Sequence, residues 1–93
     1  MNPILIEVQA ERDRQIAKGY DAAHDDGAKC GELAEVAGLV MLRLHDHEST
    51  SHVSDNVADC ILNKWGEDRR RQIIIALAMG IAEIERLDRM EKA

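Results

Sequence analysis

Apolar residues fill almost every position of two segments of the chain. In the first, residues 31–44, the polar positions are Glu32, Glu35 and Arg43, and at 100° per residue of an α-helix these three lie in one stripe. The second segment, residues 73–82, reads IIIALAMGIA and is apolar in every helical direction. Both patterns are typical of helices that are buried almost all round.

Start and stop signals divide the chain into four predicted helices. Asn2 and Pro3 form an N-cap and first-turn pair, and Gly19 is a C-terminal stop, which predicts a first helix over residues 3–18. A polar loop, residues 20–29, follows it. The other helices are expected over residues 30–44, from a cap at Ser51 or Ser54 through Val53 to a stop at Gly66, and over residues 67–90. The predicted fold is all-α, a four-helix bundle in a single domain that spans the whole chain.

The length of the chain makes it difficult for one copy to bury two such helices. At 93 residues, a chain is close to the size at which a single hydrophobic core is only just sufficient. We therefore expect a homo-oligomer, a homodimer or larger, built across the second and fourth helices. In it, Leu39, Leu42 and part of Ile73–Ile81 would be buried between chains.

The composition argues against two classes of partner. The chain has a net charge of −6, no Phe, and only Tyr20 and Trp65 as aromatic residues. Nucleic acid needs clustered Lys and Arg, and here even the run of three arginines follows two acids. No segment resembles a signal peptide, and the apolar run at 73–82 is too short to span a membrane. Cys30 and Cys60 stand outside any CxxC pair and are expected to be free thiols of a cytoplasmic protein.

The segment HDDGAKCGELAE, residues 24–35, concentrates acidic side chains at the predicted start of the second helix. Glu32 and Glu35 are three residues apart in surroundings that are otherwise apolar, where unpaired carboxylates are costly. A cation, or a basic partner such as Arg43 of another copy, would remove that cost. His24 and the two acids after it either contribute to a site or form an acidic cap before the helix.

Three stretches of the sequence resemble a known family. ERDRQIAKGYDAAHDD, GELAEVAGLV and DRRRQIIIALAMGIAEIERLDR are similar to the small MazG-like proteins of the all-α NTP pyrophosphohydrolase group, many of them carried by phages and other mobile elements. The resemblance implies a helical bundle whose carboxylates bind magnesium, which holds the nucleotide's phosphates while water attacks and pyrophosphate leaves. Glu32 and Glu35 match the last two glutamates of the family's first motif. Gly31 stands where the first glutamate should be, and matching the chain ends places Gln72 and Ile75 where the last helix would carry its two metal ligands.

Asp55 and Asp59 offer a replacement for the missing ligands. They are spaced i,i+4, so they would share one face of the third helix, and with Glu32 and Glu35 they would supply four oxygen ligands to magnesium. In the alternative interpretation, Asp55 interacts with the helix dipole in the first turn and Asp59 faces solvent.

Basic and aromatic residues are candidates for contact with a nucleotide. Lys29 or Arg43 would touch the phosphates, and His24 would orient the substrate. Tyr20 would stack on a base, or it simply packs at the end of the first helix.

Two functions of different classes fit these patterns. In the first, the chain is a magnesium-dependent nucleoside triphosphate pyrophosphohydrolase with a degenerate metal site. In the second, it is a catalytically inactive helical homo-oligomer of a phage or mobile element that binds a protein or a small ligand. The complete ligand motif of the family would decide for the enzyme, and its departures leave both functions open.

Overall fold

The computed structural model describes residues 2–27, 32–45 and 57–92, and these residues form five α-helices. The all-α prediction is confirmed. In chain order the helices are α1 (Pro3–Ala17), α2 (Ala22–Asp25), α3 (Glu32–Leu42), α4 (Val57–Lys64) and α5 (Arg69–Lys92).

Both predicted boundaries of α1 are confirmed. The side chain of Asn2 accepts a hydrogen bond from the backbone N–H of Ile4 at 2.8 Å, which satisfies one of the unpaired donors of the first turn. At the other end Gly19 has φ 108°, a left-handed conformation that glycine adopts without steric cost. The helix therefore ends where the sequence signal places its stop.

α2 is an additional helical turn within the segment expected to be a polar loop. Asp21 is its N-cap, and its carboxylate accepts a hydrogen bond from the backbone N–H of His24 at 3.1 Å. A helix of four residues is too short to produce a hydrophobic period, which is why the pattern did not reveal it.

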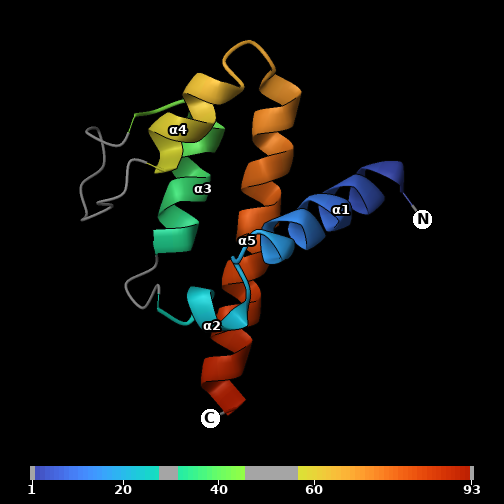
Figure 1. Ribbon diagram of the computed structural model, residues 1–93, viewed down its shortest axis with the longest axis vertical. Helices are drawn as coiled ribbons and strands as arrows, with labels where there is room; N and C mark the ends of the chain where they lie inside the picture. Colours follow the sequence, from blue (N-terminus) through green and yellow to red (C-terminus); the bar gives the residue numbers. More distant parts are fainter. Residues whose placement is uncertain (1, 28–31, 46–56, 93) are drawn as a thin grey trace.

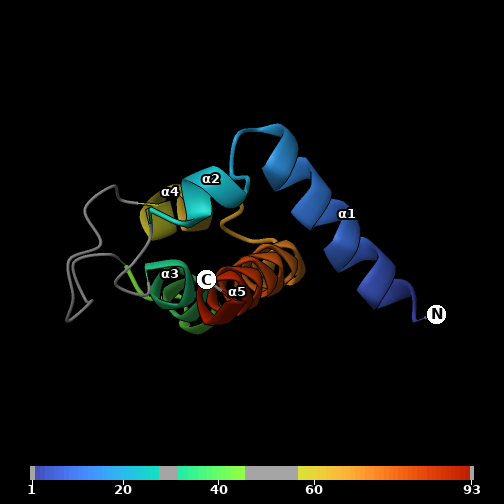
Figure 2. The same cartoon turned by 90° about the horizontal axis from the view of Figure 1, so that it is seen from below.

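α5 is the central element of the fold (Figures 1 and 2). α3 packs antiparallel along one side of it, and α4 contacts α3. α1 crosses α5 on another side, with its N-terminal half projecting away from the other helices, and α2 lies beside the C-terminal half of α5. The long helix thus joins every other element, directly or through α3.

The core consists of two clusters of buried side chains on different faces of α5. The larger one joins α3, α4 and α5, and its buried members are Val36, Leu39, Val40, Ala58, Ile75, Ala76 and Met79. The smaller one joins α1 to α5 through Val8, Ile74 and Ala78. The expectation that Leu39 is buried between chains is wrong, because Leu39 belongs to the larger cluster and is 6% exposed within one copy. Leu42, by contrast, is 70% exposed.

The C-terminus of α3 is fastened to the turn between α4 and α5. Arg43 ends the helix with φ 59° and donates a hydrogen bond to the carbonyl of Gly66 at 3.0 Å. From the start of α5, the guanidinium of Arg69 donates to the carbonyls of Val40 and Met41. The last carbonyls of a helix need partners outside it, and here Arg69, far along the chain, supplies two of them.

Ion pairs hold α1 on α5 around the small Val8 cluster. Opposite charges face each other at successive positions along the crossing: Glu7 with Arg70, Glu11 with Arg71, and Arg12 with Glu85. α1 is consequently attached to the central helix in large part by charged contacts.

Within the described ranges, none of the helices combines the length and the apolarity that crossing a bilayer requires.

Candidate functional site

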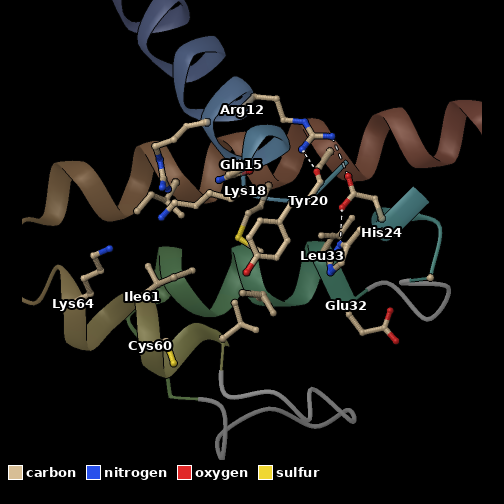
Figure 3. A pocket seen from close by; sticks show the side chains of 18 of the residues that line it. Arg12, Gln15, Lys18, Tyr20, His24, Glu32, Leu33, Cys60, Ile61 and Lys64 are labelled. Carbon is tan, nitrogen blue, oxygen red and sulfur yellow. Dashed lines mark hydrogen bonds and ion pairs between the residues drawn. The ribbon is translucent and has the colours of Figure 1, made fainter. Parts of the chain in front are cut away.

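A groove of about 800 Å³ lies between the C-terminal half of α1, α2, α3 and α4, with the middle of α5 beneath it (Figure 3). Its volume falls within the range of pockets that hold small molecules. Every helix of the described fold contributes to its lining, so the groove depends on the way α1 crosses α5.

The floor of the groove is apolar. It consists of side chains from α3, α4 and α5: Leu33, Val36, Val57, Ile61, Ile75, Met79 and Ala82. Several of them also belong to or pack on the larger core cluster, so the groove is an opening onto the core itself.

The polar lining is divided between the two ends of the groove. Lys18 and Lys64 lie toward one end, whereas His24 and Glu32 lie toward the other (Figure 3). The ring of Tyr20 lies between these two groups. One end therefore suits an anionic group, while the other end offers an imidazole and a carboxylate.

The only two aromatic residues of the chain, Tyr20 and Trp65, both line the groove. The Lys64 ammonium lies 5.4 Å from the Trp65 ring centre, and the Arg71 guanidinium lies 5.3 Å from it. Both distances are within the range of cation–π contacts, which favour positive charge over an indole face. The lysine end is thus stabilised by the aromatic ring beside it.

A buried carboxylate beside the groove, that of Glu11, binds two arginines. The side chain of Glu11 is fully buried and binds Arg14 at 2.7 Å, and it also binds Arg71. Burial alone would raise the pKa of Glu11, but hydrogen bonds from Arg14 and Gln15 and the charges of both arginines outweigh it and lower the pKa. The hydrogen bond to Glu11 in turn raises the pKa of Arg14. Because Glu11 is a single negative charge shared by two arginines, this cluster keeps a net positive charge, and Arg14 adds to the positive potential of the lysines.

A second buried ion pair fixes the opposite wall. Arg12 binds Asp25 at 2.9 Å, and both side chains are almost completely buried. The same guanidinium donates to the carbonyl of Tyr20 at 2.9 Å and to Glu85 at 3.0 Å. One arginine on α1 thereby positions the aromatic residue, α2 and the C-terminal half of α5.

The HDD segment has a structural role that the sequence did not indicate. The Nδ1 atom of His24 lies 3.3 Å from Asp25, and its half-exposed ring packs edge-on against Tyr20 with the ring centres 4.9 Å apart. Asp26 binds Arg89 of α5 at 2.8 Å. The two acids therefore attach α2 to the arginines of other helices, and the N-cap of α2 is Asp21.

The carboxylates proposed as magnesium ligands lie on two helices where they are described. Glu32 and Glu35 occupy the first turn of α3, and Glu32 lines the groove. Asp59, on α4, lies 2.8 Å from the Nδ1 atom of His45. Asp55 lies outside the described residues. Among the residues that are described, no three His, Cys, Asp or Glu side chains come together as a metal site would need.

The positions that the resemblance assigns to metal ligands on the last helix are part of the packed interior. Gln72 is fully buried and donates to the carbonyls of Trp65 and Gly66 at 3.2 and 3.3 Å. Ile75 is a core residue. α5 therefore uses both positions to pack against its neighbours, and neither side chain offers a carboxylate.

The basic residues proposed for phosphate contact are not part of the described groove lining. Arg43 lies at the end of α3, where it binds Gly66. Lys29 lies outside the described residues. Lys18 and Lys64 were not predicted from the sequence. The signal that could have indicated them is their position near the two aromatic residues of the chain, in KGY and KW.

Searches against protein-family models, curated proteins and solved structures found no match to this chain.

Proposed function

We propose that this chain is a MazG-like helical protein that binds an anionic small molecule with a flat apolar part, such as a nucleotide, in the groove between α1, α3 and α4. The observation that carries the proposal is the pair of lysines, Lys18 and Lys64, at one end of a groove that has an apolar floor and both aromatic residues of the chain. A base or another planar group would lie against Tyr20 and the apolar floor, and phosphates would lie toward the lysines.

The negative net charge of the chain distinguishes the lysine end of the groove from the rest of the surface. With a net charge of −6, the surface as a whole repels anions, so a local positive site must come from residues whose charge is not already balanced. Arg12 is balanced by Asp25, whereas Arg14 shares the single charge of Glu11 with Arg71. Lys18 and Lys64, with Arg14 beside them in the lining, are therefore the groove residues best suited to bind phosphate.

Magnesium-dependent pyrophosphate release is the second candidate function. It is favoured by Glu32, which lines the groove three residues before Glu35 on α3. Proteins often hold magnesium through one or two carboxylates together with substrate phosphates. When bound, the metal would neutralise phosphate charge, and Glu32 and Glu35 would hold it. We place binding first because Glu32 lies toward the opposite end of the groove from the lysines.

Fluorescence of Trp65, the only tryptophan of the chain, provides a direct binding assay. We expect nucleoside triphosphates to change its emission, and Lys18→Gln and Lys64→Gln each to weaken binding about tenfold, because each removes a charged partner of the phosphates. Arg43→Gln is the matched control, since it removes a positive charge outside the groove. If the two lysine variants bind as tightly as wild type and Arg43→Gln, the proposed site is wrong.

Incubation of wild type and of Glu32→Gln with the same nucleotides tests hydrolysis. Pyrophosphate release that requires magnesium and is lost in Glu32→Gln, while nucleotide binding persists, would support the enzyme. Nucleotide binding without release in wild type would support the binding module alone.

A further inference from the structure

The ring of His24 is held at the end of the groove opposite the two lysines (Figure 3). Its Nδ1 atom lies 3.3 Å from an oxygen of Asp25, and its plane meets the ring of Tyr20 at 88°. In Figure 3 the imidazole lies beside Leu33, which belongs to the apolar floor. The ring therefore has a defined orientation, although it is half-exposed.

The contact with Asp25 determines which nitrogen of this ring carries hydrogen. The other oxygen of Asp25 binds the guanidinium of Arg12. A carboxylate only accepts hydrogen bonds, so the hydrogen atom in the contact with His24 belongs to Nδ1. A neutral imidazole has a single N–H, and its Nε2 atom is then an acceptor. Because the side chain of Asp25 is buried, the exposed side of the ring is the side that carries Nε2.

The polar groups around His24 also offer acceptors to a ligand. The carboxylate of Glu32, at the same end of the groove, has no donor. Arg12 lines the groove as well, but its three nitrogens already donate to two carboxylates and to a backbone carbonyl. The chemistry of this end is therefore complementary to a ligand group that donates hydrogen bonds.

We propose that His24 selects ligands whose planar part carries an amino group, such as the bases adenine and cytosine. The inference rests on the proposed function, since it places the phosphates toward the lysines and the base against Tyr20 and the apolar floor. In that arrangement the edge of the base that points away from the phosphates meets Nε2 of His24. The exocyclic amino groups of adenine and cytosine are hydrogen-bond donors on the base edge. A ligand without the amino group would leave the acceptor unpaired, which costs affinity.

Isothermal titration calorimetry at about pH 8.5, where imidazoles are neutral, tests this selection with two pairs of ligands. In each pair a hydrogen atom replaces the amino group: ATP is compared with purine riboside triphosphate, and CTP with pyrimidin-2-one riboside triphosphate. We expect wild type to bind the amino member of at least one pair about tenfold more tightly. His24→Phe keeps a ring against Tyr20 but has no acceptor, so it should bind both members of that pair equally.

His45→Phe is the matched control. His45 is also half-exposed, and its Nδ1 atom lies 2.8 Å from Asp59, but it is not among the described residues that line the groove. This variant should keep the preference of wild type for the amino group.

The outcomes separate this inference from the proposed function. If wild type binds nucleotides but does not distinguish the members of either pair, or if His24→Phe keeps the preference, the selection by His24 is wrong and the proposed nucleotide site stands. If neither ATP nor CTP binds, the proposed function is wrong and the inference fails with it.

¹⁵N NMR of the histidine side chains tests the structural premise without a ligand. At the same pH we expect the resonances of His24, assigned by their loss in His24→Phe, to show the hydrogen atom on Nδ1. A hydrogen atom on Nε2 would overturn the inference, because the nitrogen that faces the ligand would then be a donor.

Discussion

Arg12 and Asp25 show how much of this fold depends on single buried charges. The pair is nearly inaccessible to solvent, and a charge in such a place is tolerated only with a well-placed partner. Arg12 has three: Asp25, Glu85 and the carbonyl of Tyr20. The acidic residue in the middle of the HDD segment therefore serves the architecture, since it holds α2 and one wall of the groove against α1.

We expect Asp25→Asn to lower the free energy of unfolding by about 3 kcal/mol, the low end for breaking a buried ion pair, because Arg12 keeps Glu85 as a partner. Asp26→Asn is the control. It removes a carboxylate from the neighbouring, solvent-exposed pair with Arg89, and such pairs contribute little. Urea unfolding followed by circular dichroism measures both. Equal effects of the two substitutions would contradict the structural role given to Asp25.

These contacts also mark the limit of what the sequence could reveal at single positions. Asn2 and Gly19 were predictable because caps and stops depend on neighbouring residues. Arg12 and Glu85 are 73 positions apart, and they meet only because α1 crosses α5 at one particular place. Lys18 and Lys64 become the charged end of a groove for the same reason.

α1 differs from α3 and α4 in how it is attached. α3 and α4 contact α5 or each other through an apolar cluster, whereas α1 relies on the small contact around Val8 and on ion pairs. At the centre of these ion pairs is Glu11, whose side chain is fully buried. The docking of α1, and with it one wall of the groove, should therefore depend on the ionisation of Glu11.

The lowered pKa of Glu11 determines the direction in which stability changes with pH. In the unfolded chain the carboxyl titrates near its ordinary pKa of 4.5, and in the folded chain it titrates below that value. Its contribution to stability is thus complete above about pH 4.5 and is lost as the pH falls through the folded pKa. We expect Glu11→Gln to be less stable than wild type at pH 7, with the difference shrinking as the pH falls below 4.5.

Thermal melts of the two chains between neutral and acidic pH measure that difference. Glu7→Gln is a suitable control, because Glu7 forms an analogous pair with Arg70 on the exposed side of the same crossing, and its effect should be smaller. A gap between wild type and Glu11→Gln that stays constant from neutral to acidic pH would show that Glu11 acts through packing and not through its charge.

The helices also differ in how well their sequences predicted them. α3 and α5 are long enough for their apolar runs to indicate buried helices. α3 lies within the expected segment, and α5 begins and ends two residues later than expected. Each of these runs nevertheless keeps an exposed member. Leu39 is covered by the core of its own chain, but Leu42 of the first run is 70% exposed and Leu77 of the second is 38% exposed. Periodicity shows that a helix has several apolar faces, but which face remains open depends on how many neighbours surround it.

The molecule as a whole has few buried apolar side chains for its length. The smaller cluster contains three buried residues, several buried positions carry charges, and large apolar residues such as Leu42 and Ile84 remain exposed. Chains of this size bury a limited fraction of their surface, so association can supply a substantial part of their stability. Association through the exposed apolar residues of α5, such as Ile84, would add that burial without any change within a copy.

If folding is coupled to the homo-oligomer expected from the sequence, the melting temperature must depend on protein concentration. We expect it to rise by several degrees for wild type between about 5 and about 500 μM, because mass action favours the associated folded state. For Ile84→Lys the melting temperature should stay constant over the same range. Reversible thermal melts followed by circular dichroism measure both. The same concentration dependence in the two chains would mean that Ile84 takes no part in the stabilising contact, and independence in both would mean that one copy of this fold is stable by itself.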